Sequence, residues 1–329
     1  MPKSETITVN TQTDEFFVAI CKFKEHSYMA LGVKNLAGET QLLTSLGKVI
    51  VNWRLRAGIG AVIQAEDVMS RYNSFLNYKA YSITWQNYLD FLKYMQRVQA
   101  QNHATIFPGA FPLSAFQPSE EPDLLEEDEA IVKLDWRNIK AAPGTITDDA
   151  EYRLSGGNTC RHSAIRMTRA AMGPRDMGAG VSNQFFKKLP LTATLKRAEH
   201  FDDRTQFFYI LPQPPGSYDS LPEHTRWIAK KLYRRLDEMI MMQHRNPLTM
   251  SKFQGIKGLY QQIMADQETD IVSILKGIRD WEAENRTLIA SHRKDHWFHF
   301  ATATEKMFGD LHRHFSDVEY EVDAHSNGL

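Results

Sequence analysis

The sequence predicts an α+β fold, in which a strand-rich first part is followed by an all-helical second part. Runs of aromatic and β-branched residues recur between residues 15 and 51, as they do in paired strands. The stretch PQPPGSYDSLP at 212–222 is rich in residues that break helices and strands. After it, apolar residues recur at helical spacing. We therefore expect one domain at residues 10–215 and a helical domain at 216–329.

Strands and one helix are predicted in the first half of the chain. EFFVAICKF (15–23) and SYMALGV (27–33) are apolar runs on either side of a short polar turn, which predicts a strand pair. TQLLTSLGKVIV (40–51) predicts one or two further strands. The stretch 81–102 predicts a helix, because its apolar residues recur three and four positions apart and Thr84 is suited to cap it.

A loop and a hairpin are predicted in the middle of the chain. Residues 107–130 contain several prolines and a dense acidic run, which predicts a long loop or lid. LPLTATLKRAEHF (189–201) and RTQFFYILP (204–212) are apolar runs separated by two aspartates. They predict a β-hairpin.

Composition and charge exclude several classes of protein. The net charge of −1 gives no global attraction to nucleic acid or to an anionic membrane. The sequence has no run of about 18 apolar residues and no secretory signal at residues 1–17. Its two cysteines, Cys21 and Cys160, are too few for a disulfide framework or a structural zinc site. We expect a reducing compartment, cytoplasmic or reached by a route other than Sec export, and neither cofactor nor metal.

The stretch SGGNTCRHSAIRM, residues 155–167, places Cys160 at the predicted start of a helix. A helix N-terminus favours a thiolate, and nearby arginines add positive charge. Gly156 and Gly157 allow a sharp turn, Asn158 offers a side-chain amide, and the Cys160 N–H is suited to stabilise an oxyanion. The pattern favours a nucleophilic cysteine. The alternative is a small buried residue that packs the helix.

Three histidines are candidates for the general base of Cys160. His162 lies two positions beyond the cysteine and points to another face of the same helix, which makes it a poor base. His200 follows the cysteine and precedes a predicted strand, an order similar to that of papain-type enzymes. His26 opens the predicted strand at 27–33, far upstream. From the residues alone, His26 and His200 both remain candidates.

Two separated segments together resemble the circularly permuted papain-like hydrolases. They are HSYMALGVKNLAGETQLLTSLGK (26–48) and YRLSGGNTCRHSAIRMTRAAMG (152–173). That group includes the PPPDE desumoylating isopeptidases and the relatives of lecithin:retinol acyltransferase. In these families a histidine opens an early strand, and the cysteine starts a later helix. This sequence departs from their pattern at Thr159, which is inserted between the asparagine and the cysteine, and at Ser163, where an aromatic residue is usual.

The resemblance implies a set of site residues. Cys160 is expected to be the nucleophile and His26 its general base. Gln41 is expected to orient the histidine, while Asn158 and the Cys160 N–H hold the oxyanion. A second histidine that the acyltransferases carry on the next strand is missing here, so a Cys–His dyad is the expected machinery.

Two further families are similar to parts of this sequence. GNTCRHSA is similar to the cysteine box of the ubiquitin-specific proteases, and that relationship would make His200 the base. Residues 15–215 are also similar to the cysteine-protease-like module of secreted effectors from intracellular bacteria. That similarity implies delivery into a host cell by a non-Sec route and action on a host protein.

The expected function is hydrolysis of a peptide or isopeptide bond in a protein substrate. A long acidic segment and an added helical domain suit a macromolecular substrate. Two alternatives stay open: a catalytically degenerate papain-like scaffold that binds proteins, and a cysteine-dependent acyl or transglutaminase-type transferase.

Overall fold

The computed structural model shows a mixed α+β chain that divides into two compact units, residues 1–216 and 217–329. The division falls one residue from the predicted boundary. The structure describes residues 5–23, 25–52, 59–65, 76–105, 112–119, 130–143, 153–154, 157–173, 191–193, 207–214, 218–219, 221–240, 246–265, 270–292 and 301–326.

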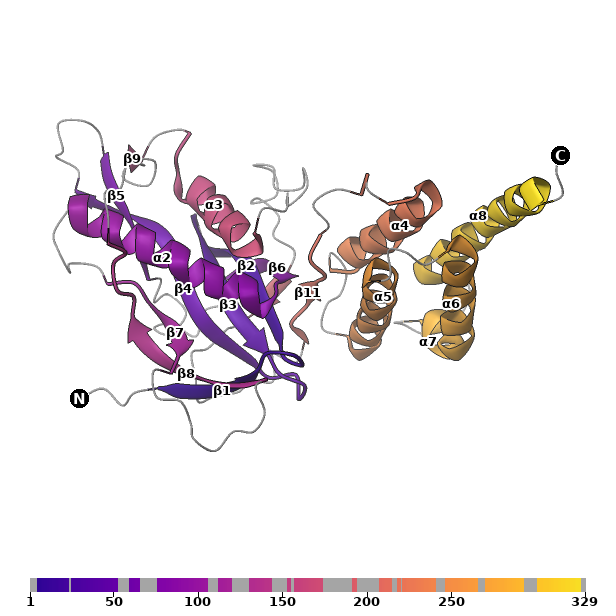
Figure 1. Cartoon of the computed structure of the whole chain (residues 1–329), viewed down its shortest axis with the longest axis horizontal. Coiled ribbons are helices and arrows are strands. Elements are labelled where there is room, and N and C mark those ends of the chain that lie inside the picture. Colours follow the sequence, from indigo (N-terminus) through magenta and orange to yellow (C-terminus); the bar gives the residue numbers. More distant parts are fainter. Residues whose placement is uncertain are drawn as a thin grey trace. The chain divides into compact units, whose positions relative to one another are not determined.

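A large twisted sheet forms the centre of the first unit (Figure 1). Its main strands run as an antiparallel meander from β2 to β5, and β6 returns to pair with β2 on the other side. The two strands predicted at 15–23 and 27–33 correspond to β2 and β3, and the one or two strands predicted at 40–51 form the single strand β4. The main strands are β2 (Glu15–Phe23), β3 (His26–Lys34), β4 (Thr40–Asn52), β5 (Ile59–Ala65) and β6 (Leu76–Ser82).

Three short strands extend the edges of this sheet and correct the predicted hairpin. β9 (Arg153–Leu154) pairs with β5. β10 (Leu191–Ala193) pairs antiparallel with β6, and β11 (Ile210–Leu211) pairs parallel with the same strand. Within the described residues the two predicted hairpin strands therefore pair with β6 and not with each other. The apolar pattern identified both as strands but carried no information about their partner.

A second, three-stranded sheet corrects the prediction of a long loop at 107–130. β7 (Ser114–Pro118) lies inside that range and pairs with β8 (Ile131–Asn138), which also pairs with β1 (Thr6–Asn10). Pro118 is tolerated because it is the last residue of an edge strand. The acidic run of the predicted lid lies outside the described residues.

Two helices cover one face of the large sheet (Figure 1). α2 (Trp85–Thr105) begins after Thr84, whose Oγ1 accepts a hydrogen bond of 3.1 Å from the Asn87 N–H, as predicted for its cap. Phe16 of β2 packs against the rings of Trp85 and Tyr88 on α2, with centroids 5.2 and 6.0 Å away. α3 (Cys160–Met172) buries its small and methionine side chains against β2, β3 and β4. They are Ala164, Met167, Ala171 and Met172.

Aromatic rings cover the opposite face of the sheet. Phe208 stacks on Tyr78 of β6, with centroids 4.3 Å apart and an interplanar angle of 4°, and also contacts Phe17 of β2. The Tyr209 N–H donates to the Tyr78 hydroxyl over 2.9 Å. Cys21 is fully buried and, by strand alternation, lies on this face with Phe17. The sheet is thus buried on both sides, which explains why its central strands read as continuous apolar runs.

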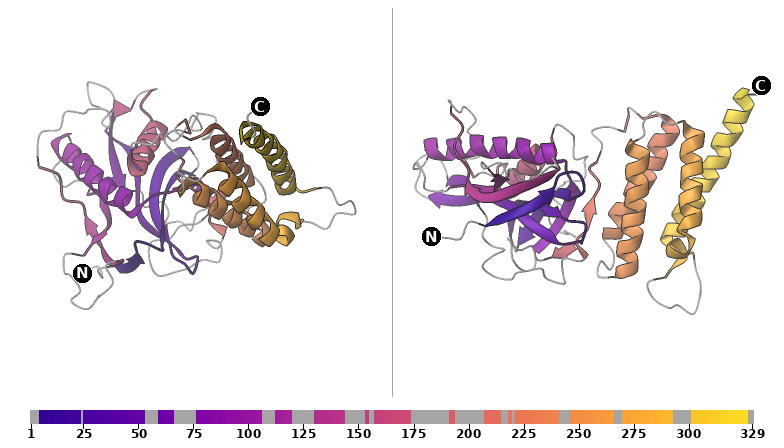
Figure 2. Two further views of the ribbon diagram at one scale, coloured as in Figure 1. Left: turned by 45° about the vertical axis from the view of Figure 1, so that its right-hand side comes forward. Right: turned by 60° about the horizontal axis from the view of Figure 1, so that its bottom comes forward.

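The second unit consists of helices in its described residues, and Figure 2 shows the long ones side by side. Its core contains Met239, Phe253 and Phe308, so methionine and aromatic side chains pack inside this unit. α5 and α6 approach closely at Gly255, where an added Cβ would lie only 2.9 Å from the Trp281 side chain. The helices are α4 (Glu223–Ile240), α5 (Pro247–Ala265), α6 (Ile271–Glu284), α7 (Arg286–Ala290) and α8 (Ala303–Ser326). Within the described ranges, no helix is long and apolar enough to cross a lipid bilayer.

Candidate active site

The first residue of α3 contacts the first residue of β3. α3 begins at Cys160, because Thr159 before it has the extended backbone of an N-cap, with φ −90° and ψ 177°. β3 begins at His26. A side-chain hydrogen bond joins the His26 imidazole to Cys160 Sγ. The structure therefore brings together the two side chains that the permuted papain-like pattern pairs.

Burial and hydrogen bonding act in opposite directions on the Cys160 thiol. Partial burial raises its pKa. Hydrogen bonds from His26 and from the backbone N–H groups of Ser27 and Arg161, with the charge of His26, more than offset this effect. The pKa of Cys160 is therefore lower than that of an ordinary thiol. Burial alone raises the pKa of Cys21 far above its ordinary value, so the pKa values of the two thiols are shifted in opposite directions.

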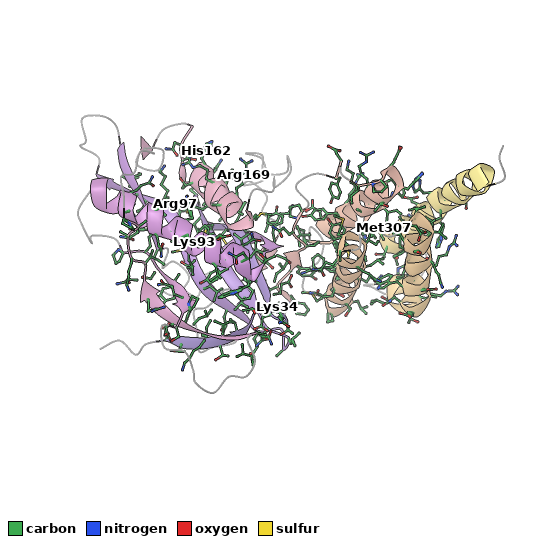
Figure 3. The ribbon with its side chains drawn as sticks, in the orientation of Figure 1. Lys34, Lys93, Arg97, His162, Arg169 and Met307 are labelled. Atoms are coloured by element: carbon green, nitrogen blue, oxygen red, sulfur yellow. The ribbon has the colours of Figure 1, made fainter. Side chains whose placement is uncertain are left out.

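The source of this lowering agrees with the expected one in part, because the Arg161 N–H belongs to the first turn of α3, whose N-terminus was expected to favour the thiolate. Nearby arginine side chains were expected to favour the thiolate, but His26 and two backbone N–H groups do so among the described residues. Arg166 instead donates to Asn158. Arg169 lies exposed in the last turn of α3 (Figure 3).

His162 caps the helix that carries the cysteine. Its Nδ1 accepts a hydrogen bond of 3.2 Å from the Thr159 N–H, and Thr159 Oγ1 lies 3.0 Å from the same nitrogen. Together with Thr159 it forms a capping box, in which the third helical residue returns to the cap residue. Figure 3 shows His162 at the N-terminal end of α3. This role agrees with the prediction that His162 is not the base.

Replacing His162 with glutamine is expected to leave folding and thiol reactivity nearly unchanged. Glutamine is a natural third residue of a capping box, so the Thr159 N–H keeps its acceptor. His162→Ala removes that acceptor and should lower the free energy of unfolding by about 1 kcal/mol. Urea unfolding measures the stability, and the rate of Cys160 alkylation measures the site. A large loss of alkylation rate in His162→Gln would assign a chemical role to His162.

Asn158 is held by two cationic side chains from different elements. Its Oδ1 accepts a hydrogen bond of 2.9 Å from Lys48 Nζ on β4 and one of 2.7 Å from Arg166 Nη2 on α3. Lys48 is only 3% exposed. Sequence reasoning did not select Lys48 for the site. The available signal was a single charged residue within the apolar run LGKVIV, where a buried strand was predicted.

The structure does not bring Gln41 to His26. Gln41 pairs with Val33 near the end of β3, seven positions along the strand from His26 and thus about 23 Å away. The expectation that Gln41 orients the histidine is wrong, because the β3–β4 hairpin places the start of β4 beside the end of β3. The His26 ring instead lies against the Tyr28 ring, with centroids 5.9 Å apart and an interplanar angle of 17°. This stacking restricts rotation of the imidazole.

The two glycines before Asn158 and the alternative base His200 were also predicted to belong to the site. Gly157 is exposed, and a Cβ there would meet nothing within 4 Å, so the turn does not require glycine at this position. Gly156 lies outside the described residues, and so does His200, the alternative base.

Comparisons with family models, with curated proteins and with solved structures return no match to this chain. In the part of the chain that the structure describes, no group of three or more histidine, cysteine, aspartate or glutamate side chains is arranged to hold a metal ion. The chemistry of this site therefore depends on its own residues. They place a thiol with a lowered pKa, an imidazole and a fixed amide at the start of one helix.

Proposed function

We propose that the chain is a thiol hydrolase that cleaves a peptide or isopeptide bond in a protein substrate. The observation that carries the proposal is the hydrogen bond between His26 and Cys160, together with the lowered pKa of the Cys160 thiol. A nucleophilic cysteine needs a lowered pKa and a base within hydrogen-bonding reach, and Cys160 has both.

In the proposed reaction, the Cys160 thiolate attacks the carbonyl carbon and forms a C–S bond. The oxyanion of the tetrahedral intermediate accepts hydrogen bonds from the Asn158 amide and the Cys160 N–H. The intermediate then collapses, and the C–N bond breaks as His26 donates a proton to the leaving amine. His26 next takes a proton from water, which attacks the thioester, and the acid product leaves with the thiolate restored.

The Cys160 N–H is assigned to the oxyanion because of its position in the helix. The first N–H groups of a helix have no partner within it. Here the Arg161 N–H donates to Cys160 Sγ, and the His162 N–H faces the Thr159 side chain. The Cys160 N–H is the remaining donor beside the sulfur in that turn.

The order of elements supports assignment of the first unit to the circularly permuted papain-like hydrolases. The histidine opens a strand early in the chain, and the cysteine starts a helix much later. The resemblance to secreted bacterial effectors extends the proposal to a host protein as substrate. In this proposal, the separate helical unit at residues 217–329 serves to recognise such a substrate.

Thiol labelling followed by a search for cleaved products tests the proposed function. At about pH 7, iodoacetamide should alkylate Cys160 at least ~10-fold faster than an ordinary exposed thiol. Native Cys21 should not react, because it is buried and its pKa is raised. A lysate treated with the wild type, but not with Cys160→Ala, should yield new peptide N-termini or newly freed lysine amines, which mass spectrometry detects.

The alternatives give different products. Slow labelling of Cys160 and no new termini would contradict the hydrolase and favour a degenerate scaffold. Transfer of acyl groups to added amines, without release of free acid, would favour the transferase. Urea-unfolded protein, in which both thiols label, provides the reference for complete alkylation.

A further inference from the structure

We propose that Lys48 and Arg166 are positioning residues that hold and polarise the Asn158 amide as an oxyanion donor. This inference rests on the thiol-hydrolase function proposed above and deepens it. Its basis is the convergence of two cations on the oxygen of one neutral side chain, two residues before the nucleophile. We refer to Lys48, Asn158 and Arg166 as the amide clamp.

The amide clamp joins the sheet to the helix that carries Cys160. Lys48 comes from β4, where it pairs with Ile63 of β5, and its buried side chain ends at Asn158 Oδ1. Arg166 comes from the second turn of α3 and also donates to Ser163 Oγ over 3.3 Å, which fixes its guanidinium on the helix. Asn158 is thus anchored to two rigid elements, although it lies in the segment that precedes the helix.

Two bonds from cations determine which way the amide faces. Rotating the amide by 180° would turn its N–H₂ donors toward Lys48 Nζ and Arg166 Nη2, which are themselves donors. That orientation loses two charge-assisted hydrogen bonds, which are roughly twice as strong as neutral ones. The nitrogen therefore stays on the side of the amide away from the two cations.

The same two bonds make the amide a stronger donor. Cations at the oxygen draw electron density through the conjugated amide, and hydrogen bonds in such a chain strengthen one another by roughly 10–30%. A donor that is polarised before the substrate arrives needs no reorganisation when negative charge develops on the carbonyl oxygen. Lys48 and Arg166 therefore act on the transition state through Asn158.

Acylation by p-nitrophenyl acetate, a small activated ester, tests the amide clamp. The Cys160 thiolate forms a C–S bond with the acetyl carbon, the C–O bond breaks, and p-nitrophenolate leaves. Removal of an oxyanion donor slows such a step by ~10²–10³-fold, so Asn158→Ala should show a loss of that order. Lys48→Met should slow acylation by ~10-fold with little change in the half-saturating ester concentration, and Lys48→Arg should restore most of the rate.

A double-mutant cycle separates positioning from a general structural effect. In the Asn158→Ala background, Lys48→Met should change the acylation rate by less than about 2-fold, because its target is gone. The pH profile of Cys160 alkylation should not move in Lys48→Met, since the groups that lower this pKa are His26 and two backbone N–H groups. Arg166→Met serves as a second clamp variant if Lys48→Met fails to fold. Arg169→Met, exposed on the same helix, is the matched control.

A readout independent of turnover keeps the two proposals distinguishable. The side-chain amide signals of Asn158 in a ¹H–¹⁵N spectrum are assigned by their loss in Asn158→Ala. They should shift in Lys48→Met and Arg166→Met and stay in place in Arg169→Met. If the wild type does not react with the ester, the hydrolase proposal fails while these signals still test the clamp. Two results would overturn the clamp. One is that the Asn158 amide signals do not move in Lys48→Met and Arg166→Met. The other is that Lys48→Met slows acylation as much in the Asn158→Ala background as it does in the wild type.

Discussion

Replacing His26 with alanine is expected to abolish nearly all activity and to raise the pKa of the Cys160 thiol. A general base contributes ~10²–10⁴-fold to the chemical step, and this histidine also supports the thiolate. Turnover should therefore fall by ~10³-fold or more. The fold should persist, because His26 is the first residue of β3 and is not part of the buried core.

The pKa of Cys160 is expected to rise in His26→Ala, so its alkylation should require a higher pH. In the wild type, the pKa of Cys160 is lowered, so the thiolate persists below the pH at which an ordinary thiol becomes protonated. In His26→Ala, burial still raises the pKa, while the hydrogen bond and the charge that opposed it are lost. The midpoint of the alkylation profile should move to higher pH. The Ser27 and Arg161 N–H groups remain and limit the shift.

Iodoacetamide alkylation from about pH 5 to pH 10, followed by mass spectrometry of the Cys160 peptide, measures that midpoint. His162→Gln is the matched control, because it changes a histidine of the same site that only caps the helix. If His26→Ala keeps the wild-type profile while the fold is intact, His26 is not the base. A base among the residues not described by the structure would then replace it, with His200 as the first to test.

Replacing Gly32 with alanine is expected to destabilise the first unit by about 3 kcal/mol, at the upper end of the usual cost of overpacking. A Cβ at this position would lie 2.3 Å from Phe17 Cζ and 2.7 Å from the Gln41 carbonyl oxygen. Phe17 cannot move away cheaply, because it is fully buried and packs on Phe208. The Gln41 oxygen belongs to the paired strand β4, beside the register shift between Leu31 and Gly32.

Hydrogen exchange of peptides from β3 and β4 measures this effect in the unit where it arises. Protection should fall by ~10²-fold, the equivalent of about 3 kcal/mol. Gly157→Ala provides the control in the same unit, since its Cβ meets nothing within 4 Å and should change stability by less than about 0.5 kcal/mol. Unchanged exchange in Gly32→Ala would mean that the strands separate to accept the methyl group.

Much of the site followed from local sequence because its parts are signalled locally. Cys160 precedes a helical pattern, and His26 precedes a strand pattern, so each was placed at the end of an element. Helix geometry predicts that His162 is not the base, and in the structure its Nδ1 accepts a hydrogen bond from the Thr159 N–H at the helix cap. The prediction that Gln41 orients His26 was wrong, because strand order alone does not reveal which residue of a neighbouring strand lies opposite. A long hairpin puts the first residue of one strand beside the last of the other.

The sequence by itself determined the type of the main elements and the division into two units. An apolar run rich in aromatic and β-branched residues and a period of about 3.6 residues are both properties of neighbouring residues, so β2, β3 and α2 were visible in them. Only the tertiary structure decided the three-stranded sheet, in which β1 pairs with β8, and the contact of Lys48 and Arg166 with Asn158. These pairings join residues that are distant in sequence. They depend on which partner buries most surface and satisfies most hydrogen bonds, and no local period records that choice.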